Sequence, residues 1–148
     1  MPPPVCAPGA HTFAKSPAIV YGTAWKKDKT EDLVFEAVKT AGFRGIDTAC
    51  QPKHYFEPGV GAAIARLAKA GVPREDLFIQ TKYTPIGGQA KASVPYNPES
   101  PLAEQVRTSF EVSVKNLQTE YLDSWVLHSP LPTDKENLQV WRAMEQDA

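Results

Sequence analysis

The chain has 148 residues, and its 16 basic and 17 acidic side chains give a formal net charge of −1. Hydrophobic residues make up 42% of the sequence and charged residues 22%, which is typical of one globular domain with a core and excludes an intrinsically disordered chain. The near-zero charge argues against a nucleic-acid-binding protein. No run of about 18 apolar residues is present, so no membrane span is expected.

The first 17 residues contain five prolines and show no hydrophobic periodicity, which predicts an irregular arm over 1–17. This segment lacks the basic start and the apolar stretch of a signal peptide. Cys6 and Cys50 have neither the spacing of a metal site nor that of a disulfide framework. We therefore expect a cytoplasmic protein without a metal ion.

Strands and helices are predicted to alternate along the rest of the chain. Short apolar runs predict strands over 18–21, 43–47, 77–81 and 121–127. Apolar residues at helical spacing predict helices over 30–41, 59–70, 102–117 and 134–145, the first capped by Thr30 and the last by Thr133. This order indicates an α/β fold with parallel strands and right-handed crossovers.

Two connecting segments differ from the others. The connector over 83–101 contains four prolines and the pair Gly87–Gly88, and a connector of this length is usually functional or mobile. The charged stretch KKDKTED over 26–32 is interpreted as a solvated loop and helix start rather than a binding patch.

Four residues with chemically useful side chains follow or end the predicted strands. They are Asp47 in GIDTA, Tyr55 or its neighbour His54 in KHYFEPGVG, Lys82 in FIQTKY and His128 in WVLHSP. In α/β folds, ligands and catalytic groups gather at the carboxyl ends of the strands. A carboxylate, a phenol, an ammonium and an imidazole at this edge can together donate a proton to a carbonyl oxygen.

These segments, in this order and spacing, resemble the aldo-keto reductase family. The resemblance covers residues 18–146 and depends most on three motifs, GIDTA, REDLFIQTK and YLDSWVLHSP, with GTAW and VWRAME as weaker matches. It is greatest to a fungal-type branch with a long proline-rich loop after the third strand. The resemblance implies a (β/α)8 TIM barrel and reduction of aldehydes and ketones by NADPH, with residues 18–148 forming part of the reductase domain.

The family's roles transfer onto matching positions of this chain. Tyr55 would be the general acid, and Lys82, held by Asp47, would lower its pKa from the usual value of about 10. His128 would orient the substrate carbonyl. The resemblance also implies that Gly22 and Thr23, together with Asp47, contact the nicotinamide and its ribose. Trp25 would form a wall of the substrate pocket.

The position of the acid departs from the family pattern. The family's tyrosine follows its aspartate by five residues, whereas Tyr55 follows Asp47 by eight, and counting back from the Val-Gly pair places His54 at the tyrosine position. Tyr55 is preferred because only a phenol matches the chemistry, with His54 as the alternative. The inserted residues Cys50, Gln51 and Pro52 are expected at the mouth of the site.

Each site residue also has a structural interpretation. Asp47 can cap a turn, Lys82 can be a solvated lysine at a strand end, and His128 can be a hydrogen-bonded histidine near the core. Tyr55 can be an exposed loop tyrosine, and Trp25 can pack over the barrel mouth.

Three further residues receive no role in chemistry. Trp125 and Trp141 are expected in core or helix–sheet contacts. Cys50 is expected to be an inert buried thiol.

The length of the chain is the second departure. A (β/α)8 barrel needs about 200–250 residues, and this sequence supplies four strands and stops inside the fourth helix. In the family, the half that is missing here makes most of the contacts to the NADPH phosphates, ribose and adenine. The alternative function is therefore a truncated, inactive relative or an interaction module. The outer strands of a four-stranded sheet invite self-association.

Overall fold

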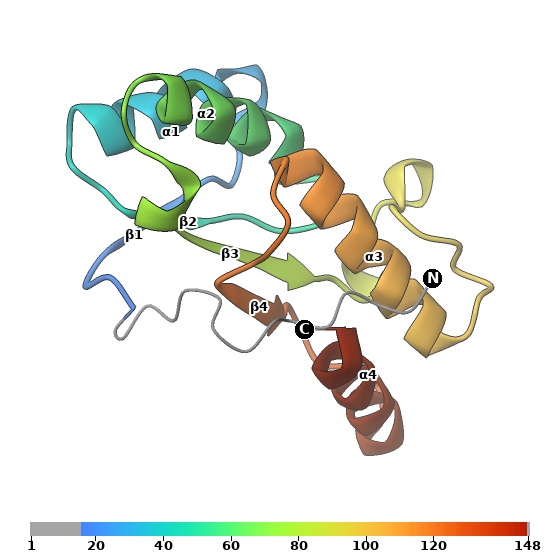
Figure 1. Cartoon of the computed structure of the whole chain (residues 1–148). Coiled ribbons are helices and arrows are strands. Elements are labelled where there is room, and N and C mark those ends of the chain that lie inside the picture. Colours follow the sequence, from blue (N-terminus) through green and yellow to red (C-terminus); the bar gives the residue numbers. More distant parts are fainter. Residues whose placement is uncertain (1–15, 148) are drawn as a thin grey trace.

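The computed structural model describes residues 16–147 as one parallel sheet with helices packed on it (Figure 1). The strands are β1 (Val20–Gly22), β2 (Gly45–Asp47), β3 (Phe78–Tyr83) and β4 (Ser124–Leu127). They lie in the order β1-β2-β3-β4, and every neighbouring pair is parallel. The predicted alternation of parallel strands and helices is confirmed.

The four α-helices follow the strands and pack against one another in chain order, α1 on α2, α2 on α3 and α3 on α4. They are α1 (Thr30–Lys39), α2 (Glu57–Lys69), α3 (Leu102–Leu117) and α4 (Asp134–Asp147). Short 3-10 turns occur at η1 (Lys27–Lys29), η2 (Arg74–Asp76), η3 (Ile86–Gly88) and η4 (Lys91–Ser93). Among the residues described, no helix is long and apolar enough to cross a membrane.

The helices bury one face of the sheet in two apolar clusters. One cluster joins Ile46 and Ile79 of the sheet to α1, α2 and the end of α3. The other joins Tyr83 and Trp125 to α3 and α4, and the Trp125 ring lies 5.0 Å from the ring of Phe110. Trp125 is thus a helix–sheet contact as predicted. The prediction for Trp141 is wrong, because this residue is 51% exposed on α4.

Strand alternation turns a second set of side chains to the opposite face. Because Ile46 and Ile79 face the helices, their neighbours Asp47 and Gln80 point the other way. The register pairs Gln80 with Ser124 and Lys82 with Val126, so these residues share that face. We call it the inner face; it is the side that carries the candidate chemistry.

The ends of the elements differ from the predicted ends by a few residues. β3 extends through Tyr83, which places Lys82 within the strand rather than after it. α2 begins at Glu57, two residues earlier than predicted, because a proline in the first turn is compatible with a helix start. Gly42 and Gly71 follow α1 and α2 with φ of +81° and +91°, a conformation that favours glycine.

One predicted helix cap is confirmed and one is wrong. The Thr133 hydroxyl and the Glu136 carboxylate bond to each other and to each other's backbone N–H groups, which forms a capping box at the start of α4. Thr30 is instead the first residue of α1, and its hydroxyl donates to the Lys27 carbonyl oxygen at 2.6 Å. The preceding η1 turn supplies the helix start, so Thr30 has no capping position to fill.

The connector that follows β3 is packed against the molecule. The Tyr96 hydroxyl donates to the Thr84 carbonyl oxygen at 2.7 Å, and Tyr96 is only 5% exposed. Gln51 Nε2 donates to the Gly88 carbonyl oxygen at 2.6 Å, and Gln89 Nε2 to that of Cys50 at 2.9 Å. These bonds attach the connector to the loop after β2.

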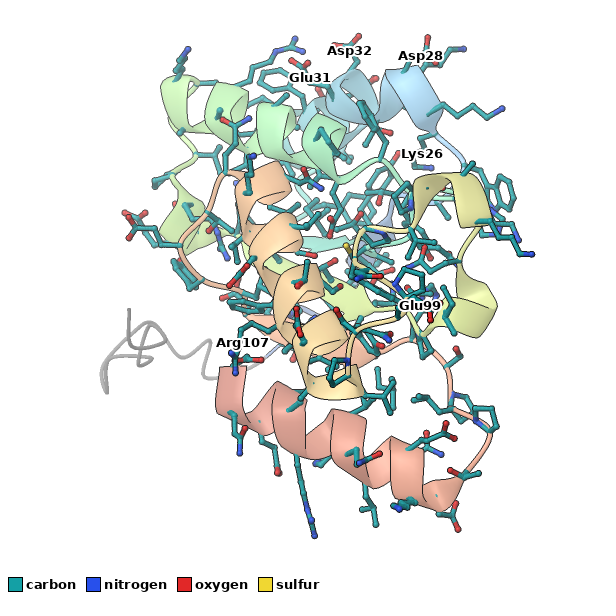
Figure 2. The ribbon with its side chains drawn as sticks, turned by 90° about the vertical axis from the view of Figure 1, so that its right-hand side faces the viewer. Lys26, Asp28, Glu31, Asp32, Glu99 and Arg107 are labelled. Carbon is teal, nitrogen blue, oxygen red and sulfur yellow. The ribbon has the colours of Figure 1, made fainter. Side chains whose placement is uncertain are left out.

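Charged residues before and within α1 lie on the outer surface of the molecule. Figure 2 shows Lys26, Asp28, Glu31 and Asp32 near one another at that end. Arg66 of α2 pairs with Asp32 at 2.7 Å and Glu31 at 3.7 Å. Most of the stretch is therefore a solvated surface, as predicted, but Lys27 and Asp28 also line a cavity. The predicted arm lies outside the described residues up to residue 15, and the boundary after residue 17 stays a prediction.

Candidate active site

An ion pair between β2 and β3 lies at the centre of the candidate site. Lys82 Nζ is 2.7 Å from both Asp47 Oδ1 and Oδ2, and donates to the Thr48 carbonyl oxygen at 2.9 Å. The side chains are 12% and 22% exposed, respectively. Because the ammonium meets three acceptors at once, Lys82 is fixed in position, and the predicted pairing with Asp47 is confirmed.

Two residues that the sequence analysis missed extend this pair across the inner face. Gln80 Nε2 donates to Asp47 Oδ1 at 2.9 Å. The Ser124 hydroxyl donates to Gln80 Oε1 at 2.8 Å, which orients the amide. The signal that points to Gln80 is strand alternation, because it lies two positions before Lys82 on the same strand.

Tyr55 lies beside this pair, on the loop between β2 and α2. Its ring centroid is 5.0 Å from Lys82 Nζ and 5.9 Å from the centroid of the His128 ring. Burial of the phenol and the negative charge of Asp47 raise the pKa of Tyr55 above its usual value. The prediction of a lowered Tyr55 pKa is therefore wrong, because burial and the Asp47 charge both raise it and Lys82 is already paired with Asp47.

His54 points to a different neighbour. Its ring centroid lies 4.0 Å from that of Trp25, and its carbonyl oxygen accepts the Trp25 N–H at 2.8 Å. Trp25 is 65% exposed, with φ of 63°. Of the two candidates for the acid, Tyr55 has ring contacts with Lys82 and His128, whereas His54 stacks on Trp25 and reaches His128 only through its charge.

His128 follows β4 and is held by the start of the connector. Its Nδ1 lies 2.8 Å from the Thr84 hydroxyl, and its backbone N–H donates to the Tyr83 carbonyl oxygen at 2.9 Å. Burial and the nearby Lys82 charge lower the pKa of His128 below 6.5, so the ring is neutral at neutral pH. When the Thr84 hydroxyl donates to Nδ1, Nε2 carries the ring proton and is a hydrogen-bond donor.

A cavity of about 320 Å³ borders the phenol. It is lined by aromatic residues with charged residues among them: Trp25, Lys27, Asp28, Pro52, Lys53, His54, Tyr55 and Phe56. Of the three inserted residues expected at the mouth, Pro52 alone lines this cavity. The expectation is wrong for Cys50 and Gln51, which are buried beneath the loop.

Of the residues expected to contact a cofactor, Gly22 borders open space and Thr23 is buried. A Cβ at Gly22 would meet no atom within 4 Å, so the end of β1 leaves open space beside Asp47. Thr23 is fully buried, and both its hydroxyl and its N–H donate to the Asp47 carbonyl oxygen, at 2.8 and 3.0 Å. These two hydrogen bonds join the end of β1 to β2. The predicted contact of Thr23 with the cofactor ribose stays a prediction.

The buried carboxylate of Glu57 is bonded to β3, the strand that carries Lys82. Glu57 is 3% exposed and accepts from the Thr81 hydroxyl at 2.6 Å and from the Ser113 hydroxyl at 2.9 Å. Burial raises its pKa. Burial and the Glu57 charge raise the pKa of the neighbouring Cys50 thiol to about 12, so Cys50 is the inert buried thiol that was predicted. The signal for Glu57 is its place in the first turn of α2, next to Pro58.

Comparison with known proteins identifies the family. The family model described as the aldo/keto reductase family matches residues 9–147. The chain belongs to the aldo/keto reductase family. The fold agrees, because four parallel strands alternating with helices form the first half of this family's TIM barrel.

Relatives of this aldo/keto reductase chain include the uncharacterized oxidoreductase ZK1290.5 of Caenorhabditis elegans. The two sequences are 31% identical, and the match covers 87% of this chain and 36% of the relative. The methylglyoxal reductase DkgB of Escherichia coli O157:H7 is 35% identical over 83% of the chain and 39% of the relative. The solved aldo/keto reductase of Brucella melitensis is 32% identical with a TM-score of 0.64, over 86% of the chain and 42% of the solved chain. The chain spans less than half the length of these relatives.

Proposed function

We propose that this chain carries the proton-donating residues of an NADPH-dependent reductase that converts aldehydes or ketones to alcohols. The observation that supports the proposal is the grouping of Tyr55 with Lys82, Asp47 and His128 at the carboxyl ends of β2, β3 and β4. These residues come from separate segments, and all of them border the inner face or the cavity beside it.

Tyr55 would donate the proton in this reaction. Its raised pKa keeps the hydroxyl protonated at neutral pH, so the donor is present before the reaction. As the substrate carbonyl becomes an alkoxide, the phenol proton moves to its oxygen and a phenolate remains. Lys82, with Nζ 5.0 Å from the ring centroid, would stabilise that charge.

His128 would position the carbonyl group. Its neutral ring, with Nδ1 bonded to Thr84, can present Nε2–H to the substrate oxygen. Thr84 is a positioning residue in this proposal, because it acts through the orientation of the imidazole. The aromatic cavity beside Tyr55 fits the apolar part of a small carbonyl compound.

The nicotinamide end of NADPH fits the residues present. Open space above Gly22, next to the Asp47 carboxylate, leaves room for a flat ring at the end of β1. When bound there, the cofactor would supply the hydride. The names of relatives such as DkgB support a reductase of small carbonyl compounds, and a cytoplasmic location is part of the same proposal.

Titration of the purified chain with NADPH tests this proposal, with the fluorescence of its three tryptophans as the signal. We expect saturable binding, followed by aldehyde-dependent oxidation of NADPH. In Lys82→Met, turnover should fall by about 100-fold or more, because the phenolate loses its cation. An exposed control, Lys69→Met, should keep both properties. Absence of binding at millimolar NADPH, or full turnover in Lys82→Met, would contradict the proposal.

A further inference from the structure

Glu57 is a buried carboxylate to which the proposed reaction gives no role. It is the first residue of α2, directly after the loop over 48–56 that carries Tyr55 and that we call the acid loop. Among the residues that the structure describes, none of the ion pairs includes Glu57. A buried carboxylate without a cation is costly unless hydrogen bonds replace its water. The position of Glu57 therefore depends on its hydrogen-bond donors.

These donors come from two other elements, β3 and α3. Glu57 Oε1 accepts from the Thr81 hydroxyl of β3 at 2.6 Å and from the Ser113 hydroxyl of α3 at 2.9 Å. Oε2 accepts from Asn116 Nδ2 of α3 at 3.2 Å. Thr81 and Ser113 are fully buried, so water does not compete for their bonds. One carboxylate thus joins the start of α2 to a strand and to the helix beside it (Figure 1).

The bond between Glu57 and Thr81 lies close to the candidate acid–base residues in the chain. Thr81 precedes Lys82 on β3, and the two side chains point to opposite faces of the strand. Glu57 follows Tyr55 by two residues. The start of the acid loop is held by the same strand, because the Cys50 N–H donates to the Lys82 carbonyl oxygen at 3.1 Å. Both ends of the acid loop are therefore attached to the strand that carries Lys82.

We propose that Glu57 is a positioning residue for Tyr55. By bonding to β3 and α3 it fixes the end of the acid loop, and so sets the phenol against Lys82 and His128. Tyr55 meets these two residues through its ring, with the ring centroid 5.0 Å from Lys82 Nζ and 5.9 Å from the His128 centroid. Ring contacts restrain a side chain less than hydrogen bonds do, so the place of the phenol depends on the loop backbone. This role rests on the proposed function, in which Tyr55 donates the proton.

The role needs hydrogen-bond acceptors rather than a negative charge. Glutamine has the length of glutamate, and its amide oxygen can accept from both hydroxyls that bond to Glu57 Oε1. Its amide nitrogen can donate to Asn116 once the Asn116 amide is turned over. Glu57→Gln should therefore hold the acid loop, whereas Glu57→Ala and Thr81→Val should release it.

NMR of the full chain tests this role without a cofactor. The readout is the NOE cross-peak between the ring protons of Tyr55 and His128. We expect the parent and Glu57→Gln to show this cross-peak, and Glu57→Ala and Thr81→Val to lose at least half of its intensity. Thr81→Val preserves the shape of the side chain, so it decides the question if Glu57→Ala does not fold. The control is Ile64→Val, which removes one buried carbon from α2 away from the carboxylate and should keep the cross-peak.

Turnover gives the second readout. Under the proposed function, Thr81→Val should lower kcat by about tenfold or more with KM within a few-fold, while Ile64→Val stays close to the parent. The positioning role is overturned if the parent lacks the cross-peak, if Thr81→Val keeps it, or if Glu57→Gln or Ile64→Val loses it. A parent chain with the cross-peak but no turnover would contradict the proposed function alone, and the cross-peaks of the variants would still decide the role of Glu57.

Discussion

At the scale of single residues, burial and the balance of charge around Tyr55 set the pKa of the proposed proton donor. Lys82 is shared among Asp47 and the Thr48 carbonyl oxygen, so its charge is largely matched in the resting chain. Burial and Asp47 then raise the pKa of Tyr55. In the proposed reaction, the lysine would therefore stabilise the phenolate that forms during proton transfer, rather than create it beforehand.

His128 gives a prediction that needs no cofactor. Burial and Lys82 lower its pKa, so the unfolded chain binds more protons as the pH falls. Its contribution to the free energy of unfolding is thus complete above pH 6.5 and is lost below it. In NMR titrations, Lys82→Met should raise the His128 pKa, because a cation is removed and Asp47 is released. Lys69→Met should not change it, and an unchanged pKa in both variants would refute the proximity of Lys82 to His128.

The candidate site was largely predictable from motifs, because each motif places one residue at the end of a strand. The contacts of Gln80, Thr84 and Glu57 were not, since they depend on which side chains from distant segments meet. The pKa of Tyr55 was predicted with the wrong sign because a sequence does not show how deeply a loop phenol is buried, and burial is the largest cause of the raised pKa.

At the scale of elements, close packing between α2 and α3 holds the site loop in place. A Cβ added at Gly61 of α2 would lie 2.0 Å from the Asn116 carbonyl oxygen of α3. We expect Gly61→Ala to lower the free energy of unfolding by about 3 kcal/mol or more, measured by urea denaturation. Gly87→Ala is the control, because nothing lies within 4 Å of its Cβ, and should change stability by less than about 0.5 kcal/mol. Equal stability of the two variants would contradict this packing.

The elements themselves were predicted well where hydrophobic periodicity is long. α3 has the predicted bounds of 102–117, whereas β1 and β2 have three residues each and shift by up to two residues. Short strands of a parallel sheet carry little periodic signal, so their ends depend on pairing with neighbours. The connector after β3 could not be predicted as packed, because its anchors are single hydrogen bonds from Gln51, Gln89 and Tyr96.

At the scale of the whole molecule, the described residues form one four-stranded parallel sheet, and the candidate acid–base residues lie at the carboxyl ends of β2, β3 and β4. Its likeness to the Brucella melitensis reductase covers 86% of this chain but 42% of that one. Titration of the purified chain with NADPH therefore tests whether the residues of β1 to β4 bind a dinucleotide.

The most direct test of the account compares two variants of the acid loop. NADPH-dependent aldehyde reduction is measured for Tyr55→Phe and for His54→Phe, alongside the parent chain. Since Tyr55 lies against Lys82 and His128 while His54 packs on Trp25, we expect Tyr55→Phe to lose about 100-fold or more of kcat and His54→Phe to keep it within a few-fold. Retained activity in Tyr55→Phe, or a loss confined to His54→Phe, would contradict the assignment of Tyr55 as the proton donor.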